Sequence, residues 1–204
     1  MKIEIIILLS YLLGSIPFGF LLTKFFLKKD IRNIGSGNIG ATNALRTGNK
    51  LVGYLTLTLD ILKAVLPVLF VKFNYIEFLY VSSLCVFLGH VFPVWLKFKG
   101  GKGVATYLGI LFCINIYLGA LFGIVWLTIF FIFKYSSLSS LTGSLSIPIM
   151  SYFILEDKTV IFFIIMFVLI FFTHRENIKR LLNHTESKTK IYWFDYCGIF
   201  CVVS

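Results

Sequence analysis

The most constraining feature of the sequence is an apolar run that is too long for one membrane helix. Residues 104–133 contain no charged side chain. A single α-helix of that length would reach about 45 Å, whereas the hydrocarbon core of a bilayer is about 30 Å thick. The run is therefore either one strongly tilted helix or two shorter helices broken near Asn115 and Gly119.

The composition places the whole chain in a membrane. Of its 204 residues, 58% are hydrophobic, only 14% are charged, and 23 are phenylalanine. A water-soluble domain of this size could not bury so much apolar surface. These values exclude disordered, collagen-like, coiled-coil and disulfide-knot proteins, and they predict an all-α polytopic integral membrane helix bundle. The net charge of +10 then reflects cytoplasmic loops and anionic headgroups better than nucleic-acid binding.

Five further runs are long enough to count as spans, at residues 3–23, 51–71, 75–95, 137–155 and 159–173. The first lacks the cationic start and small-residue cleavage site of a signal peptide, so it is kept as a span. With the long run split, we predict seven transmembrane helices, an outside N-terminus and a cytoplasmic C-terminus, because this places most of the 19 Lys and Arg residues inside. Six spans would put the C-terminal cations outside, and five spans remain an alternative if one late segment is re-entrant.

The sequence shows no internal repeat and no linker. We therefore expect a single membrane-embedded domain at residues 1–190. Residues 191–204 form an apolar tail that is too short to cross a bilayer, and an interfacial position is expected for it.

Two loops on the predicted cytoplasmic side are rich in glycine and basic residues. Residues 35–46 combine three glycines with hydroxyl and amide side chains and an arginine, a set that suits anion binding better than an ordinary turn does. In residues 97–106, glycines surround Lys102 at the start of a predicted helix, whose N-terminus attracts phosphate. Positive-inside anchoring explains Lys97 and Lys99 but not these glycines. The candidate phosphate-binding residues are Gly35, Ser36, Gly37, Asn38, Gly40, Thr42, Asn43, Arg46, Gly100, Gly101, Lys102 and Gly103.

A third polar group follows the last span. His174 and Asn177 are three residues apart, so they share one face of a helix and could orient a hydroxyl group or accept its proton. The alternative is a solvated helix end. Hydroxyls of residues 136–140, with Ser139 as the candidate ligand, either complete the site or cap a helix, and the cap is slightly favoured.

Three further polar residues lie within or at the ends of predicted spans. Asp60 and Lys63 are expected to form a mutual ion pair, because charges at that depth are costly unless paired. His90 is expected to be a structural histidine.

No metal or cofactor is predicted. The sequence has no aspartate-rich or HExxH metal motif, no nucleophilic serine elbow, and no Cys/His ligand set among Cys85, Cys113, Cys197 and Cys201.

Taken in order, these motifs resemble the bacterial membrane glycerol-3-phosphate acyltransferases that use acyl phosphate as donor, the PlsY family. The resemblance runs from about residue 10 to 186. It rests on residues 14–19, 35–46, Asp60 with Lys63, 89–106, 137–141, and 174–181 with Glu186. Two features depart from the family: His184 stands where a glycine is usual, and the tail after Lys190 is untypical.

The resemblance implies seven helices and a reaction. Acyl phosphate and sn-glycerol 3-phosphate would give 1-acyl-glycerol 3-phosphate (lysophosphatidic acid) and phosphate, the first acylation step of phospholipid biosynthesis, at the cytoplasmic side of the bacterial inner membrane. It also implies transient contact with the acyl-ACP:phosphate acyltransferase that makes the donor.

An acyl phosphate is already activated, so we expect direct attack by the 1-hydroxyl. Lys102 would neutralise the leaving phosphate, while Arg46, His174 and Asn177 hold glycerol phosphate. The proton passes to the departing phosphate or to His174, and the phosphate is favoured. A transporter of a phosphorylated metabolite and a non-catalytic scaffold are the competing functions. A transporter needs a midplane site with access from both sides.

Overall fold

The computed structural model describes residues 2–155 and 157–189, and within these ranges the chain is helical and contains no strand. Three short 3-10 helices, η1 (Ile31–Asn33), η2 (Ile76–Phe78) and η3 (Val94–Leu96), connect the longer elements. The α-helices are α1 (Lys2–Ser15), α2 (Phe18–Leu27), α3 (Ala41–Leu45), α4 (Lys50–Asn74), α5 (Leu79–Val91), α6 (Val104–Ile114), α7 (Ile116–Phe133), α8 (Ser136–Ile154), α9 (Asp157–Thr173) and α10 (Arg175–Leu182).

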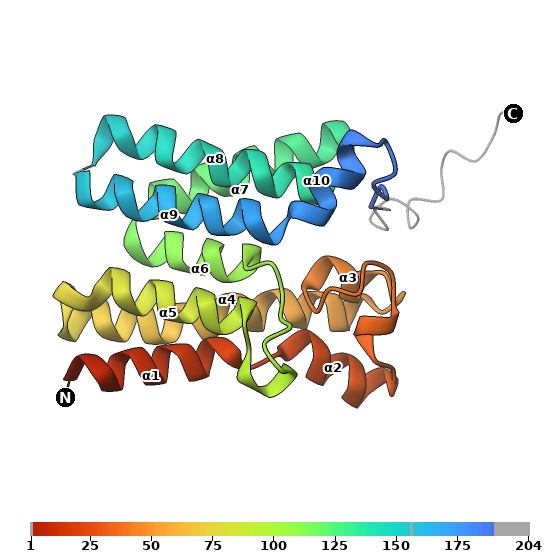
Figure 1. Cartoon of the computed structure of the whole chain (residues 1–204), viewed down its shortest axis with the longest axis horizontal. Helices are drawn as coiled ribbons and strands as arrows, with labels where there is room; N and C mark the ends of the chain where they lie inside the picture. The colour runs from red at the N-terminus through yellow and green to blue at the C-terminus, as the bar shows by residue number, and fades with distance from the viewer. Residues whose placement is uncertain (1, 156, 190–204) are drawn as a thin grey trace, which may run out of the picture.

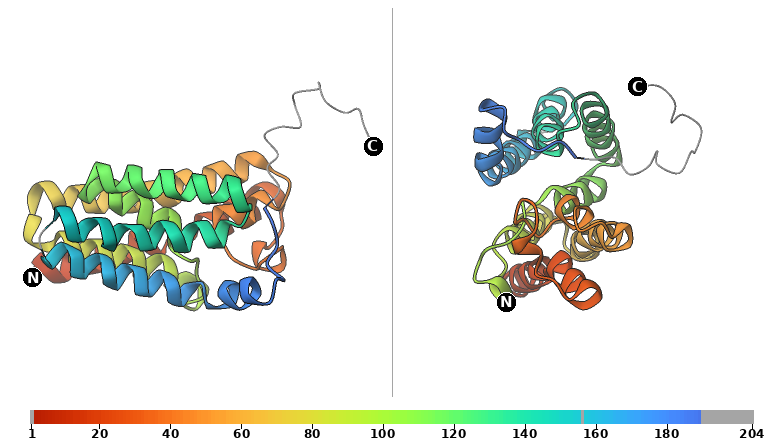
Figure 2. Two further views of the ribbon diagram at one scale, coloured as in Figure 1. Left: turned by 90° about the horizontal axis from the view of Figure 1, so that it is seen from above. Right: turned by 90° about the vertical axis from the view of Figure 1, so that its right-hand side faces the viewer.

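The long helices run side by side along the longest axis of the molecule (Figure 1). Seen end-on, they form two groups: α1, α2, α4 and α5 on one side, and α7 to α10 on the other, with α6 between them (Figure 2). The main packed pairs are α1 with α5, α4 with α6, and α7 with α8. The short helix α6 therefore joins the two groups, and the loop before it ends at their junction.

The long apolar run is broken at Asn115, as predicted. This residue has an extended backbone between α6 and α7. Its side-chain Oδ1 accepts hydrogen bonds from the N–H groups of Tyr117 at 2.9 Å and Leu118 at 3.4 Å. Asn115 thus ends one helix and caps the next, which is the usual role of an asparagine at a helix N-terminus.

Four segments of the described chain are long and apolar enough to span a membrane: Lys2–Leu27, Lys50–Asn74, Ile76–Leu96 and Ile116–Phe133. A fifth is added if α9 and α10, which meet at a 63° bend, count as one span. Helix α6 is only 11 residues long, and serines interrupt the apolar sequence of the continuous helix α8. The membrane helix bundle is thus as predicted, while seven spans and the orientation of the termini remain predictions. The tail at residues 191–204 lies outside the described residues.

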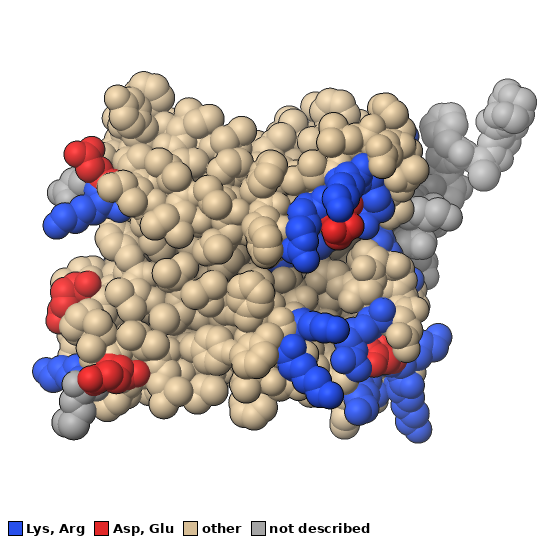
Figure 3. Space-filling view, viewed as in Figure 1, with Lys and Arg blue, Asp and Glu red and all other residues tan. Residues whose placement is uncertain are grey.

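Charge is distributed unevenly along the bundle. Lys and Arg side chains gather at the end that carries α2, α3 and α10, and fewer lie at the opposite end (Figure 3). The flanks between the two ends are apolar, with exposed side chains such as Leu66 of α4 and Ile164 of α9, which suits contact with lipid.

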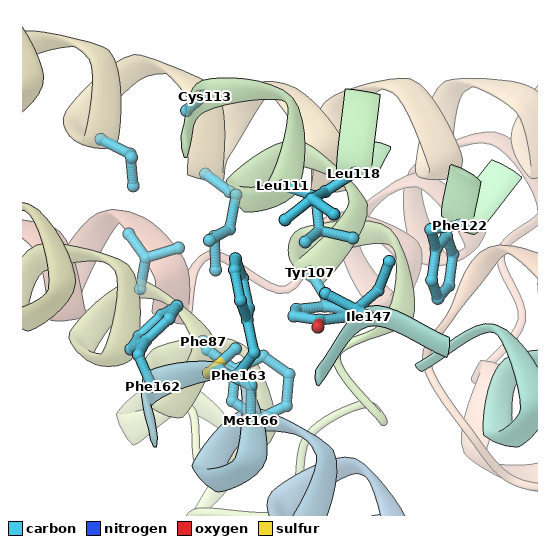
Figure 4. Packing of buried hydrophobic residues seen from close by; sticks show 14 of the residues in the cluster. Phe87, Tyr107, Leu111, Cys113, Leu118, Phe122, Ile147, Phe162, Phe163 and Met166 are labelled. Atoms are coloured by element: carbon cyan, nitrogen blue, oxygen red, sulfur yellow. The ribbon is translucent and has the colours of Figure 1, made fainter. Parts of the chain in front are cut away.

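The buried core centres on α6 and fixes where the following site is built. Tyr107 of α6 is fully buried among Phe87 of α5, Phe163 and Met166 of α9, and Phe122 of α7 (Figure 4). The Tyr107 and Phe122 rings meet edge to face at 5.7 Å. Because packing rather than hydrophobic transfer holds helices together in a membrane, this cluster anchors the start of α6 against α9.

Candidate active site

A cavity of about 850 Å³ opens between the two helix groups at the basic end of the molecule. Its polar lining comes from the segment that includes α3, the loop before α6, the start of α8 and the segment from His174 to Thr189, together with Asp60 of α4 and His90 of α5. Its apolar wall is formed by Leu57, Val104, Leu108, Phe122, Gly123, Trp126 and Leu127. One cavity therefore joins a cationic pole to a hydrophobic lobe.

The first glycine-rich loop is organised by Asn43. Its side-chain Nδ2 donates to the carbonyls of Ile31, Ile34 and Asn38 at 3.1, 2.8 and 2.8 Å, and its Oδ1 accepts from the N–H of Ser36 at 3.0 Å. The side-chain amide of Asn43 therefore holds the loop in shape, and its role in phosphate binding stays a prediction.

Glycine is required at position 35 of this loop. Gly35 has φ = +54°, and a Cβ there would lie 2.4 Å from Oδ1 of Asn43. Of the residues predicted to bind phosphate, Gly35, Ser36, Asn38, Gly40, Thr42, Asn43 and Arg46 do line the cavity. Gly37 does not, and its N–H donates to Ile34.

Arg46 forms one cationic wall of the cavity. Its guanidinium donates through Nη2 to Oγ of Ser187 at 2.8 Å, and the remaining N–H groups belong to a fork suited to phosphate. Nearby, Oγ1 of Thr42 lies 3.2 Å from Oγ of Ser136, which links the first loop to α8.

Lys102 forms the second cationic group. Its ammonium donates to Oδ1 of Asn177 at 2.6 Å, and its backbone carbonyl accepts from Thr173 at 3.1 Å. Burial lowers the pKa of Lys102 to about 8. The carboxylate of Glu186 opposes this shift, and the positive charges of Arg180 and Arg46 add to it. The amine is thus mostly charged at pH 7 and loses its proton more readily than an exposed lysine.

The glycines beside Lys102 have a different role from the one predicted. The N–H groups of Gly100 and Gly101 donate to the carbonyls of Val91 and His90, each at 3.1 Å, and neither residue lines the cavity. The expectation that they cradle phosphate is corrected, because their donors are already used. Gly103 does line the cavity, has φ = +84°, and leaves no room for a Cβ beside Phe87.

Glu186 is the centre of the polar network. Its Oε1 accepts from Ser137 at 2.6 Å and from Nδ2 of Asn177 at 2.7 Å, and its Oε2 accepts from Nε of Arg180 at 2.6 Å. Burial acts to raise the pKa of Glu186, but these hydrogen bonds outweigh it and hold the pKa below its ordinary value. Glu186 thereby fixes the Asn177 amide with its oxygen toward Lys102. Glu186 follows the third polar group in the sequence and belongs to the motifs of the family resemblance, but it is not among the predicted site residues.

His174 follows the end of α9 and is buried. Its Nδ1 lies 2.8 Å from the carbonyl of Ile170, and because a carbonyl only accepts, Nδ1 carries the proton in this contact. Burial and the nearby Lys102 charge lower the pKa of His174 to about 4, although the hydrogen bond to Ile170 and the charge of Glu186 oppose the shift. The ring is therefore neutral at pH 7 and has its lone pair on Nε2. It lines the cavity together with Asn177, as predicted.

The serines at the start of α8 do not cap the helix. The cap position is Tyr135, with no side-chain hydrogen bond, so the slightly favoured cap reading is wrong. Ser136, Ser137 and Ser140 line the cavity instead. Ser139 is fully buried, donates to the Tyr135 carbonyl at 2.9 Å and does not line the cavity, so the structure does not bring this candidate ligand to the site.

The expected ion pair in α4 is confirmed. Nζ of Lys63 lies 2.8 Å from Oδ1 of Asp60, and both side chains are buried. Within the described residues no group of three or more His, Cys, Asp or Glu could hold a metal ion. Cys85 and Cys113 are free thiols, and Cys197 and Cys201 lie outside the part of the chain that the structure describes.

The fold and the cavity define a class: an all-helical integral membrane protein with one amphiphilic cavity whose polar end is lined by cations. A family model described as glycerol-3-phosphate acyltransferase matches residues 4–184, and the chain belongs to this family.

Close relatives and solved structures agree with this assignment. The glycerol-3-phosphate acyltransferase of Pelagibacter ubique is 71% identical over 192 residues, covering 94% of this chain and 100% of the relative. The enzyme of the same name from Mesorhizobium japonicum is 50% identical, covering 88% and 92%. The crystal structure of PlsY, an integral membrane glycerol 3-phosphate acyltransferase, in its glycerol 3-phosphate form superposes with a TM-score of 0.88 at 37% identity, covering 93% and 96% of the two chains. The lysophosphatidic acid form gives a TM-score of 0.84 at 37% identity, covering 92% and 95%.

Proposed function

We propose that this protein transfers an acyl group from acyl phosphate to the 1-hydroxyl of sn-glycerol 3-phosphate, giving lysophosphatidic acid and inorganic phosphate. This is the first acylation step of phospholipid biosynthesis. The observation that carries the proposal is the single cavity in which Arg46 and Lys102 stand at one end and an apolar lobe at the other. Its relatives bear this enzyme name, and PlsY has been crystallised in forms named for the substrate and the product.

The cavity suits two phosphate-bearing substrates. One substrate is small and doubly anionic, and the other joins a phosphate to an acyl chain. Lys102 and Arg46 supply full charges for the phosphates, and the Leu108, Phe122 and Trp126 side chains offer a surface for the chain. Holding both substrates side by side supplies much of the rate, since effective molarities of about 10⁵–10⁸ M are reached in well-oriented reactions.

The chemistry needs no protein nucleophile, because an acyl phosphate is a mixed anhydride. The 1-hydroxyl oxygen forms a bond to the acyl carbon, the bond between that carbon and the phosphate oxygen breaks, and the bond electrons leave with the phosphate. The Lys102 ammonium stabilises the charge on this leaving group. Arg46 and Asn177 hold glycerol phosphate.

The proton of the attacking hydroxyl goes to the departing phosphate. His174, with a pKa of about 4, is a weak base, and its Nε2 lone pair is suited to accept a hydrogen bond that orients the hydroxyl. The sequence alone offered no partner to orient this ring, whereas the structure provides the Ile170 carbonyl. Substrate assistance remains the favoured route because the low pKa of His174 makes this ring a weak base, even though the ring is oriented.

The topology belongs to the same proposal. Helices occupy every predicted span, with α1 and α2 together filling the first, and the cations gather at the end that holds the cavity. These features support seven spans, an outside N-terminus and an active site on the cytoplasmic side of the bacterial inner membrane. An acyl-ACP:phosphate acyltransferase would then deliver the donor at this face by transient contact.

The test is a donor comparison with purified protein. Labelled glycerol 3-phosphate is offered acyl phosphate, acyl-CoA or acyl-ACP in separate reactions, and lysophosphatidic acid is quantified. Product from acyl phosphate alone is expected. Lys102→Met should lower kcat/KM about 10²–10³-fold, as loss of one transition-state donor does, whereas Lys99→Met, an exposed lysine of the same loop, should not. Product from acyl-CoA but none from acyl phosphate would refute the proposed donor.

A further inference from the structure

His90 is a buried ring beside the cavity that the proposed reaction does not use. It lies in the last turn of α5 and is 3% exposed. It lines the cavity together with Asp60. The Asp60–Lys63 ion pair lies on one side of the His90 ring, and the loop that carries Lys102 lies on the other side.

On the loop side, His90 holds the turn that precedes Lys102 in two ways. Its backbone carbonyl accepts the N–H of Gly101, and the carbonyl of the next residue, Val91, accepts the N–H of Gly100. Its ring also packs directly on the loop, since a Cβ added at Gly101 would lie 2.1 Å from Nε2. The ring thus sets how closely the loop approaches α5.

On the other side, the ring faces a fixed carboxylate. Nδ1 of His90 lies 3.7 Å from Oδ1 of Asp60, which is too long for a hydrogen bond but close enough to favour the tautomer with its proton on Nδ1. Asp60 is paired with Lys63, whose ammonium donates to the carbonyl of Ile16 at 2.8 Å, at the break between α1 and α2. The ion pair is therefore tied to two helices and cannot drift from the ring.

We propose that His90 is a positioning residue for Lys102: its ring, oriented by the Asp60–Lys63 ion pair, and its carbonyl fix the Gly100–Gly101 turn so that the Lys102 ammonium points into the cavity. The kinetic consequence rests on the proposed acyl transfer, whereas the structural consequence does not.

The kinetic test uses the contact between the ring and Gly101. His90→Ala should lower kcat/KM for acyl transfer about 10²-fold, the usual effect of misplacing a catalytic group by about 1 Å. Gly101→Ala should do the same from the loop side, because its methyl group collides with the ring. In the His90→Ala background the ring is gone, so adding Gly101→Ala should cost less than about twofold.

A second readout follows Lys102 without any reaction. Trace acetylation of the full-length protein across a pH series, read by mass spectrometry, gives the midpoint at which Lys102 becomes reactive. The groups that face this amine are Asn177 and Arg180 of α10, Glu186, Arg46 and His174. Burial places its pKa at about 8. If the loop relaxes toward water in His90→Ala, the midpoint should rise by more than one pH unit.

The matched control is Ser83→Ala, which removes a fully buried hydroxyl from the same helix. This hydroxyl donates to the Leu79 carbonyl, and Ser83 does not line the cavity. Its Lys102 midpoint should stay near pH 8, and the curves of Lys97 and Lys99 should be the same in every sample. A midpoint near 8 in His90→Ala would overturn the proposal, as would a Gly101→Ala penalty that is equal in both backgrounds. If His90→Ala does not fold, the midpoint of Lys102 acetylation measured in Gly101→Ala tests the proposal in its place, by the same criterion. Failure of wild-type acyl transfer would refute the proposed function and leave the labelling curves unchanged.

Discussion

The charge state of Lys102 should control the alkaline limit of the enzyme. With a pKa of about 8, the ammonium is about 90% protonated at pH 7 and about 10% protonated at pH 9. The second ionisation of a phosphate monoester, near pH 6, is nearly complete across this range, so substrate charge changes little. If only the charged amine stabilises the leaving phosphate, kcat/KM should fall about tenfold between pH 7 and 9.

The assay is initial-rate acylation of glycerol 3-phosphate from saturating acyl phosphate, with kcat/KM measured at half-unit pH steps. The limb in kcat should lie at higher pH than the limb in kcat/KM, because a bound phosphate stabilises the ammonium. Lys102→Arg keeps its charge throughout, so its kcat/KM, although lower, should be flat to pH 9. A wild-type kcat/KM that does not decline by pH 9 would show that the Lys102 charge is not needed.

Three further changes test other parts of the site. Glu186→Gln removes the carboxylate that raises the pKa of Lys102, so the alkaline limb should move to lower pH; an unmoved limb would mean that Glu186 does not act on Lys102. His184→Gly should stabilise the protein by about 1 kcal/mol and raise Tm by about 2–4 °C, because His184 has φ = +55° just after α10, and an unchanged Tm would count against this strain. Gly123→Leu, whose Cβ meets no atom within 4 Å, should fill the apolar lobe and lower kcat/KM at least fivefold with long-chain donors but little with short ones, given an overpacking cost of about 1–3 kcal/mol. An equal loss with all chain lengths would place the acyl chain elsewhere.

Features set by local chemistry could be predicted from the sequence. Helix length against bilayer thickness left a tilted helix or a break near Asn115, and the distribution of Lys and Arg favoured the break. The Asp60–Lys63 pair follows from the cost of unpaired charge in a membrane. The unusual residue His184 also has a structural explanation, since its left-handed backbone is one that favours glycine.

Features set by contacts between distant segments could not be predicted. Gly100 and Gly101 have the composition of a phosphate cradle, yet their N–H groups bond to the end of α5. The sequence does not show that the Asn43 side chain also bonds to the carbonyls of Ile31, Ile34 and Asn38 and so shapes the loop. No local sequence pattern predicts that Glu186 accepts a hydrogen bond from Ser137, which lies 49 positions earlier in the chain.

The prediction that the serines cap a helix was wrong because the sequence does not fix where α8 begins. Ser136, Ser137, Ser139 and Ser140 have the composition of a helix cap, but they lie inside the first turns of α8. A helix presents some positions to a neighbour and others to its own interior contacts, so Ser137 reaches the cavity while Ser139 does not. Only the placement of α8 against α7 and α10 decides which serine faces the site.

The central claim is that one cavity holds both phosphate-bearing substrates at once and that the hydroxyl attacks the acyl phosphate directly. Initial velocities measured while acyl phosphate and glycerol 3-phosphate are varied together test this most directly. Direct transfer predicts double-reciprocal lines that intersect, because both substrates must be bound before phosphate leaves. Parallel lines, with phosphate released from acyl phosphate before glycerol 3-phosphate is added, would reveal a covalent acyl-enzyme and contradict the account.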